Sequence, residues 1–350
     1  MGIPLVLPSA MRESEPKHIA TVGATGAVGV EILKCLEQRE FPVSKLTLLA
    51  SSRSVGRKMP FRGEMVTVAE LREDSFGGVD IALFSAGGGV SKEFAPGAVE
   101  AGATVIDNSS AFRMDAEVPL VVPEINPEDV KCGPGIIANP NCTTTIALMG
   151  LNPLHQAFGG VEKIIASSYQ AVSGSGAGGI SELEDQVEAI ARNEPIPIKN
   201  IYAHQIAFNV IPQVDTFLDS GYTKEEMKMH FEGRKILHIP DLKASVTCVR
   251  VPVYRSHAIA VTAVFKNQPS VEAAREAITS APGVELADEP FSDDPRRQFP
   301  TPLDCTNGDN CLVGRIRRDL VLDQALTFWV VGDQVRKGAA LNAVQIAELL

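Results

Sequence analysis

Long apolar runs, aromatic residues and positive charge are all scarce in this sequence of 350 residues. No apolar run reaches the roughly 18 residues that a transmembrane helix needs. Only 5% of the residues are aromatic, and Lys and Arg number 32 against 43 Asp and Glu, which gives a net charge of −11. Nucleic-acid binding draws on a basic surface and aromatic stacking platforms. The composition therefore argues against a membrane protein and against a nucleic-acid partner.

Cysteine motifs are also missing, although the chain has six cysteines, at positions 35, 132, 142, 248, 305 and 311. No two of them form a Cys-x-x-Cys pair, so we expect neither a disulfide framework nor a metal site. Such a chain suits the reducing cytoplasm. Residues 1–16 lack the basic start of a signal peptide, and we read them as an extension that is disordered or a leader.

Two patterns of secondary structure follow one another along the chain. Up to Asn141, short apolar strands alternate with amphipathic helices, which predicts a parallel sheet with crossover helices. After Asn141 the strands are longer, and residues 245–253 and 257–266 are expected to be antiparallel neighbours. The 45% hydrophobic content is ample for more than one core. The fold class predicted is therefore α/β for the first part and α+β for the second, with an amphipathic helix at residues 338–350.

A glycine-rich turn connects the first predicted strand to the first predicted helix. Gly23, Gly26 and Gly29 have the spacing G-x-x-G-x-x-G. Such glycines permit a tight turn, close approach of a pyrophosphate and close packing of helix on strand, and the helix N-terminus attracts negative charge. An ordinary strand-to-helix turn is the alternative. The position between strand and helix favours a dinucleotide site.

The end of the second predicted strand bears on which dinucleotide binds. An NAD site usually has an acidic residue there for the ribose hydroxyl. Here the sequence is Ala50-Ser-Ser-Arg-Ser54, without an acidic residue. Arg53 suits a 2′-phosphate, which favours NADP, and a solvated surface loop is the alternative. A second cluster, Ser85-Ala-Gly-Gly-Gly89, would let the cofactor lie against the backbone.

Cys142 is the candidate nucleophile. It follows the turn Asn139-Pro-Asn141 and precedes a helical segment, so it lies at a helix N-terminus, where a thiolate is stabilised. A buried structural thiol is the alternative. Among the six histidines, His257 stands out because it follows Arg250 and Arg255 across two strand-like runs.

At these residues the sequence resembles the bacterial aspartate-β-semialdehyde dehydrogenases, from about Lys17 to Leu350. Five motifs occur in order: Gly23-Ala-Thr-Gly-Ala-Val-Gly29, Asn108-Ser-Ser-Ala-Phe-Arg113, Asn139-Pro-Asn-Cys142-Thr-Thr, Ser168-Tyr-Gln170-Ala-Val-Ser-Gly174, and Cys248-Val-Arg250 with Ser256-His257. The resemblance implies reduction of L-aspartyl-4-phosphate by NADPH to aspartate-4-semialdehyde with release of phosphate, in lysine, threonine, methionine and diaminopimelate biosynthesis.

The resemblance also implies a role for each matching residue. Cys142 is the nucleophile, His257 the acid/base and Gln170 the group that orients the reacting centre. The implied substrate residues are Arg113, Arg250, Glu225, Lys228, Asn141 and Ser110, with Asn108 as the alternative to Ser110 and Glu226 as the alternative to Glu225. The implied NADP residues are Gly23, Thr25, Gly26, Ala27, Val28, Gly29, Ser51, Ser52, Arg53, Ser54, Ala86, Gly87, Ser173, Gly174 and Gln334; no metal is implied.

The implied architecture is a Rossmann-type NADP domain beside a catalytic and dimerisation domain similar to that of glyceraldehyde-3-phosphate dehydrogenase. We expect residues 17–141 with 332–350 in the first domain and 142–331 in the second. The resemblance implies a homodimer and leaves a tetramer open. N-acetyl-γ-glutamyl-phosphate reductase is the nearest alternative enzyme. A regulatory cofactor-binding module is the non-enzyme alternative, although it leaves Cys142, Gln170 and His257 unexplained.

Overall fold

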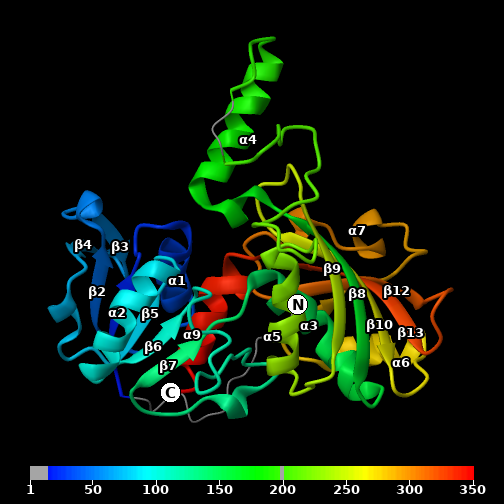
Figure 1. Ribbon diagram of the computed structural model, residues 1–350, viewed down its shortest axis with the longest axis horizontal. Coiled ribbons are helices and arrows are strands. Elements are labelled where there is room, and N and C mark those ends of the chain that lie inside the picture. The colour runs from blue at the N-terminus through cyan, green and yellow to red at the C-terminus, as the bar shows by residue number, and fades with distance from the viewer. Residues whose placement is uncertain (1–14, 198–200) are drawn as a thin grey trace. The chain divides into compact units, whose positions relative to one another are not determined.

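The computed structural model describes residues 15–197 and 201–350, and it divides the chain into two units (Figure 1). The first unit contains the described residues up to Asn141 and Ala339–Leu350, and the second contains Cys142–Gly338. Residues 332–338, which we assigned to the first domain, thus lie with the second unit. Most of the expected extension, residues 1–14, lies outside the described residues.

The first unit is built on a seven-stranded sheet with the order β3-β4-β2-β1-β5-β6-β7. Its strands are β1 (Lys17–Val22), β2 (Val43–Ala50), β3 (Lys58–Phe61), β4 (Glu64–Glu70), β5 (Ile81–Phe84), β6 (Thr104–Asp107) and β7 (Gly135–Ala138). β3 pairs antiparallel with β4, and the other neighbours pair in parallel. The expected Rossmann-like sheet is therefore confirmed.

Both faces of this sheet are buried, as expected for parallel strands with crossover helices. Side chains such as Ile81 and Leu83 of β5 pack with α1 (Ala27–Gln38) and α9 (Leu341–Ala347). The alternate residues Ala82 and Phe84 pack on the other face, with α2 (Gly88–Glu100). The period of two along the strand thus assigns each helix to one face.

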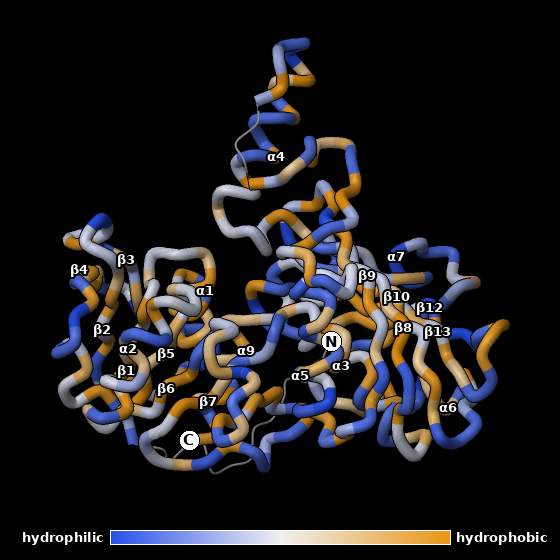
Figure 2. The backbone as a smooth tube through the Cα atoms, in the orientation of Figure 1, coloured by the Kyte–Doolittle hydropathy of each residue, from blue (hydrophilic) through white to orange (hydrophobic). Residues whose placement is uncertain are grey.

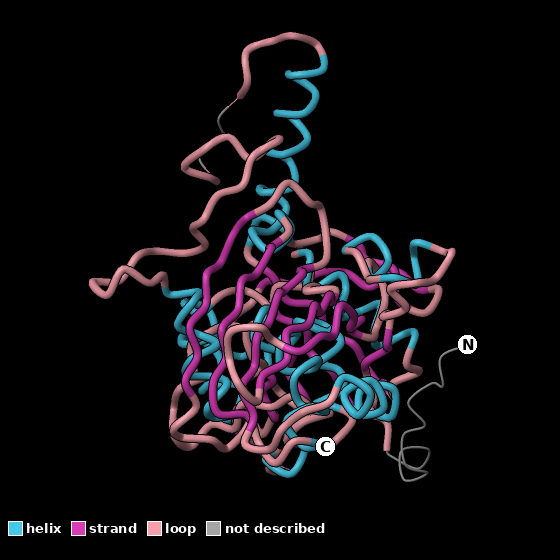
Figure 3. The backbone as a smooth tube through the Cα atoms, turned by 90° about the vertical axis from the view of Figure 1, so that its right-hand side faces the viewer, coloured by secondary structure: helices cyan, strands magenta, loops and turns pink. Residues whose placement is uncertain are grey.

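The second unit holds a six-stranded sheet with the order β11-β12-β13-β10-β8-β9, whose strands lie side by side in Figure 3. Its strands are β8 (Val161–Gln170), β9 (Lys243–Arg250), β10 (His257–Phe265), β11 (Val284–Leu286), β12 (Cys311–Arg318) and β13 (Ala325–Gly332). Its helices are α3 (Cys142–Ala157), α4 (Gly176–Ala191), α5 (Lys224–Ile236), α6 (Val271–Ser280), α7 (Pro295–Gln298) and α8 (Pro302–Cys305).

The prediction that residues 245–253 and 257–266 pair with each other is wrong. β8 lies between β9 and β10, parallel to the first and antiparallel to the second. The six residues that join β9 to β10 include Pro252, which has no N–H, and Val251 donates its own N–H to Gln170 O at the end of β8. The chain therefore crosses the end of β8 and does not form a hairpin.

Helix α4 extends away from the sheet of its own unit and alternates hydrophobic with hydrophilic residues along its length (Figures 1 and 2). Its apolar side packs on Ile206 and Ala207. The fully buried Gln186 accepts hydrogen bonds from the N–H groups of these two residues, at 2.9 and 3.0 Å. The side chain of Gln186 thus holds the irregular segment that contains Ile206 and Ala207 against α4.

No helix within the described ranges is long and apolar enough to cross a membrane.

We predict that Gln186→Ala weakens this attachment, because two buried N–H groups lose their acceptor at a cost of about 1–3 kcal/mol for each unsatisfied group. Hydrogen exchange followed by mass spectrometry should show faster exchange in the peptide that contains Ile206 and Ala207. Arg192→Ala, at the C-cap of the same helix, is the matched control, since its side chain makes an exposed ion pair with Glu188. Equal exchange in both variants would contradict the prediction.

Candidate active site

Three of the predicted site residues meet at one edge of the six-stranded sheet. Gln170 and Arg250 end the parallel strands β8 and β9 and are partners in register. His257 begins β10, which runs antiparallel to β8, so it lies at the same edge. All three are buried, with 2%, 5% and 0% of their surface exposed. The sheet topology itself gathers these side chains.

The residue that follows β8, Ala171, holds two of these side chains through its backbone. Its N–H donates to Nδ1 of His257 at 3.0 Å. Its carbonyl oxygen accepts from Nη1 of Arg250 at 2.6 Å. A single residue of the main chain therefore fixes the ring and the guanidinium side by side.

The bond from Ala171 also determines where His257 carries its proton. Since Nδ1 accepts a hydrogen bond, the neutral ring has its hydrogen on Nε2. In the part of the chain that the structure describes, Nε2 is buried without a hydrogen-bond partner. Burial, and then the positive charge of Arg250, hold the pKa of His257 well below its ordinary value. The ring is therefore neutral and offers one buried N–H donor.

Cys142 is the first residue of α3 and is partly exposed. The helix N-terminus places N–H groups and the positive end of the dipole beside its sulfur, which favours a thiolate. A π-helix, η6 (Arg336–Ala340), follows β13 and brings Gly338 against it. A Cβ at Gly338 would lie 2.7 Å from the Cβ of Cys142. Only glycine leaves room for Cys142 there.

A hydrogen-bonded network surrounds the residue after Cys142. Nε2 of Gln170 donates to Oγ1 of Thr143 at 2.8 Å and to Oε1 of Glu225 at 3.3 Å. Nζ of Lys228 lies 2.7 Å from the other carboxylate oxygen of Glu225. Gln170, Glu225 and Lys228 are thus brought together next to the residue that follows Cys142.

Glu226, the alternative to Glu225, makes different contacts. Its carboxylate accepts from the N–H of Thr223 at 2.7 Å and from the N–H of Cys248 at 3.0 Å. Thr223 is the N-cap of α5, and the pair forms a capping box. Glu226 therefore ties α5 to β9, and Glu225 is the one that reaches Gln170.

The remaining predicted substrate residues belong to the first unit. Arg113 is buried and donates from Nε to Asn139 O and from Nη2 to Asn108 O, both at 2.9 Å. Asn108 and Asn139 are themselves joined by a side-chain hydrogen bond of 2.8 Å. Ser110 is exposed and Asn141 is buried. Arg113 is thus oriented by two main-chain carbonyls.

The predicted cofactor residues of the first unit form the turns beyond β1, β2 and β5. Gly23 has φ 79°, and a Cβ on it would lie 2.8 Å from Ser85 O. The N-cap of α1 is Gly26. Thr25 and Ser54 share a hydrogen bond of 3.2 Å, which joins the glycine-rich turn to the turn that carries Arg53. These positions form a tightly packed turn at a helix N-terminus, the kind of position at which a dinucleotide pyrophosphate binds.

Three predicted cofactor residues lie in the second unit. Gln334, two residues beyond β13, donates from Nε2 to Oγ of Ser173. Gly174 follows Ser173, and a Cβ on it would lie 3.3 Å from Cε1 of His257. Gly174 therefore packs beside the ring of His257.

Sequence reasoning missed two residues of this site, Thr143 and Ser256. Thr143 follows the candidate nucleophile directly, so its position in the motif was an available signal. Ser256 has φ 74° and precedes His257, and its N–H donates to Oε1 of Gln334 at 2.7 Å. Nothing in the local sequence predicts the positive φ of Ser256.

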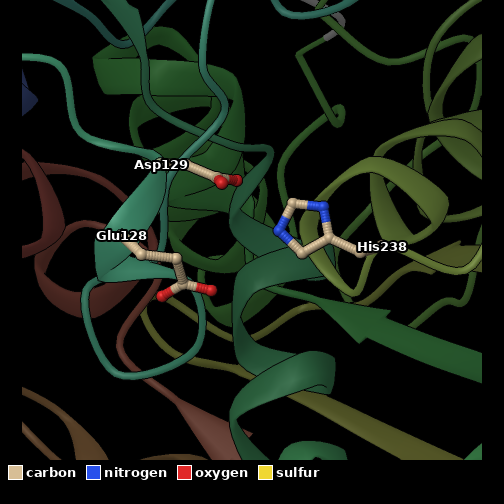
Figure 4. Close-up of side chains that lie close together, drawn as sticks. All are labelled: Glu128, Asp129 and His238. Atoms are coloured by element: carbon tan, nitrogen blue, oxygen red, sulfur yellow. The ribbon is translucent and has the colours of Figure 1, made fainter.

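Figure 4 shows a separate group of side chains, Glu128, Asp129 and His238. Glu128 and Asp129 belong to the first unit and His238 to the second. Within either unit, two adjacent carboxylates or one histidine do not make up a metal site, so we assign none to them.

Comparisons with known proteins agree with this arrangement. Residues 18–132 match a family model described as the semialdehyde dehydrogenase NAD binding domain, and residues 151–337 match the semialdehyde dehydrogenase dimerisation domain. The aspartate-semialdehyde dehydrogenase of Aquifex aeolicus is 50% identical over 95% of this chain and 97% of its own length. The enzyme of Bacillus subtilis is 49% identical over 95% of this chain and 97% of its own length.

Solved structures give the same result. The crystal structure of aspartate semialdehyde dehydrogenase II from Vibrio cholerae, complexed with ASA, has a TM-score of 0.90 at 46% identity and covers 96% of this chain and 98% of its own. The Candida albicans enzyme with NADP has a TM-score of 0.73 at 26% identity, with 96% and 98% covered.

The fold and the site define a semialdehyde dehydrogenase with a nucleotide-binding and a dimerisation domain. More narrowly, the chain belongs to the aspartate-semialdehyde dehydrogenase family. The resemblance seen in the motifs is confirmed, and the relatives favour the aspartyl substrate over the N-acetylglutamyl alternative.

We predict that iodoacetamide at pH 8 distinguishes the cysteines of the native protein. Burial raises the pKa of Cys248 and of Cys305 to about 12, so both stay almost entirely as unreactive thiols. The exposed Cys132 and the partly exposed Cys142 should react. Peptide mass spectrometry after brief labelling measures this, with urea-unfolded protein as the control in which all are modified. Rapid labelling of native Cys248 would contradict it.

Proposed function

We propose that this chain reduces L-aspartyl-4-phosphate to L-aspartate-4-semialdehyde with NADPH, through a thioester on Cys142. The observation that carries the proposal is the meeting of Gln170, Arg250 and His257 at one sheet edge, with Gln170 bonded to the residue after Cys142. This set combines a nucleophile, an N–H donor and a carboxylate-binding cation. A regulatory cofactor-binding module would not need these three groups together.

Substrate binding uses the fixed charges of the site. Arg250 binds the α-carboxylate, since a guanidinium matches a carboxylate with two parallel hydrogen bonds. Glu225 binds the α-amino group. The phosphate is held by Arg113 and Lys228, with Asn141 and Ser110 as further donors. The net charge of the chain is −11, so these cations are a local exception, and they supply the positive charge that a substrate with two anionic ends needs.

The chemistry begins with the thiolate of Cys142. Its sulfur attacks the acyl carbon, a C–S bond forms, and the C–O bond to phosphate breaks with the electron pair leaving on phosphate. A bound nicotinamide cofactor would supply the hydride that reduces the thioester carbonyl. In the acid/base role proposed for His257, its Nε2–H donates a hydrogen bond to the resulting oxyanion, and the neutral ring keeps its proton because the oxyanion expels the thiolate directly. When the C–S bond breaks, the aldehyde leaves and Cys142 regains its thiolate.

The cofactor residues fit a dinucleotide that carries a 2′-phosphate. In the glycine-rich turn, Gly23 and Gly29 allow close backbone packing, and Gly26 at the N-cap of α1 is where the pyrophosphate would approach the helix N-terminus. Ser51, Ser52, Arg53 and Ser54 present hydroxyls and one exposed cation, with no acidic side chain among them. The absence of an acid in this turn supports NADP over NAD. Thr25, Ala27, Val28, Ala86 and Gly87 complete the backbone cradle, with Ser173, Gly174 and Gln334 toward the nicotinamide.

The assembly we propose is a homodimer through the second unit, which matches the dimerisation-domain family, with a tetramer as the alternative. The cysteine spacing and the biosynthetic activity support a cytoplasmic location. The product would supply lysine, threonine, methionine and diaminopimelate biosynthesis.

The proposed activity predicts phosphate-dependent reduction of NADP by aspartate semialdehyde, followed as absorbance of NADPH. Cys142→Ala should lose essentially all turnover, because no other group can carry the acyl intermediate, and should still bind NADPH. Cys248→Ala is the matched control and should keep most activity. Turnover with N-acetylglutamate semialdehyde but none with aspartate semialdehyde would reverse the assignment.

We also predict that Arg53→Ala raises the Kd for NADPH about 10- to 100-fold, because a charge-assisted hydrogen bond to phosphate contributes about 1.5–3 kcal/mol. Binding of NADH should change little, since it has no 2′-phosphate. Fluorescence titration of each cofactor measures this, with Arg57→Ala as the neighbouring exposed control. Equal losses for both cofactors would remove Arg53 from the 2′-phosphate site.

A further inference from the structure

Both ends of the Gln334 side-chain amide are used inside the protein. Its Oε1 accepts the N–H of Ser256 at 2.7 Å, and its Nε2 donates to Oγ of Ser173. Gln334 is only 3% exposed. An amide that has both functions satisfied in this way acts first as a link between two chain segments.

The first of these segments is strained. Ser256 is fully buried and has φ 74°, a region that non-glycine residues avoid. Besides the bond to Gln334, its Oγ lies 3.0 Å from Oγ1 of Thr306. Such a conformation persists only where its surroundings hold it. Since His257 is the next residue, the backbone turn at Ser256 sets the direction in which the imidazole leaves the main chain.

The second segment lies against the same ring. Gly174 follows Ser173, and a Cβ on it would lie 2.9 Å from Nη1 of Arg250 and 3.3 Å from Cε1 of His257. Gln334 therefore holds the segment that precedes His257 and the segment that packs beside its ring.

The neighbouring residue, Asp333, strengthens the first link. Its buried carboxylate accepts from Nε of Arg255 and from the N–H of Asn307, both at 2.7 Å. Asp333 and Gln334 thus hold two consecutive residues, Arg255 and Ser256, just before His257.

We propose that Gln334 is a positioning residue that holds Ser256 in its left-handed conformation and thereby fixes the imidazole of His257 in the site. The proposal rests on the acid/base role proposed for His257. It gives Gln334 a function that does not require contact with the cofactor.

The test is Gln334→Ala. Without the amide, Ser256 can relax, and kcat should fall about 10- to 100-fold, the loss expected when a reacting group is displaced by about 1 Å. The Kd for NADPH should change less than threefold. A residue that only contacted the nicotinamide would give the opposite pattern.

The pH profile gives a second readout. A proton on Nδ1 would break the bond from Ala171, so activity should be lost as the pH falls through the pKa of His257. That pKa is held low by burial and by Arg250. Arg255 and Asp333, which form an ion pair, are charged groups on the adjoining segments described above. Loosening the site admits water, so in Gln334→Ala the acid limb should move up toward the ordinary value of 6.5. In the wild-type protein, kcat should stay constant through the pH range in which Gln334→Ala loses activity.

Rescue by glycine tests the backbone directly. Glycine adopts positive φ without the penalty that a side chain brings. Gln334→Ala with Ser256→Gly should therefore recover several-fold in kcat over Gln334→Ala alone, and Gln334→Ala with Ser256→Ala should not. Gln345→Ala is the matched control for losing a buried glutamine, since Gln345 bonds Glu124 in the first unit. It should leave kcat and the acid limb unchanged.

Three outcomes overturn the proposal: an unchanged kcat with an unmoved acid limb, a loss confined to NADPH binding, or no difference between the glycine and alanine variants at 256. If Gln334→Ala does not fold, the single variants Ser256→Gly and Ser256→Ala decide the matter, and equal rates would refute it. His257→Asn tests the proposed role of His257 separately from the positioning role of Gln334. A wild-type rate in that variant would refute the acid/base role of His257.

Discussion

The site depends on one residue of the main chain, Ala171. The N–H of Ala171 binds His257, and its carbonyl oxygen binds Arg250. A shift of Ala171 would therefore move both side chains together. This arrangement is possible because β8 lies between β9 and β10. Had those two strands paired directly, no peptide group would lie between the two side chains. The strand order is therefore what holds these two side chains together.

Much of this protein could be predicted from local sequence. The glycine-rich turn, the parallel sheet of the first unit and Cys142 at a helix start each follow from residues close together in the chain, whose spacing has a direct physical meaning. The network around Gln170 could be expected only through the resemblance, because Gln170 and Glu225 are far apart in sequence.

The rest depends on long-range pairing. The order of β8, β9 and β10 is decided by which strands share a register, and Pro252 alone does not specify that. The choice between Glu225 and Glu226 is similar. Adjacent residues on a helix point in different directions, so the rotation of α5 against β9 decides which of them enters the site. Ser256, with its positive φ, is hydrogen-bonded to Gln334, 78 residues away, a contact that local sequence does not indicate.

The contacts of Glu226 have a consequence for the head group that the proposed site can hold. By binding the N–H groups of Thr223 and Cys248, Glu226 fixes the start of α5 against β9, two residues before Arg250. In the proposed site, Glu225 on α5 binds the amino group of the substrate and Arg250 on β9 binds its carboxylate. The spacing between these two binding groups is therefore set by the attachment of a helix to a strand, which a change at either binding residue would leave in place.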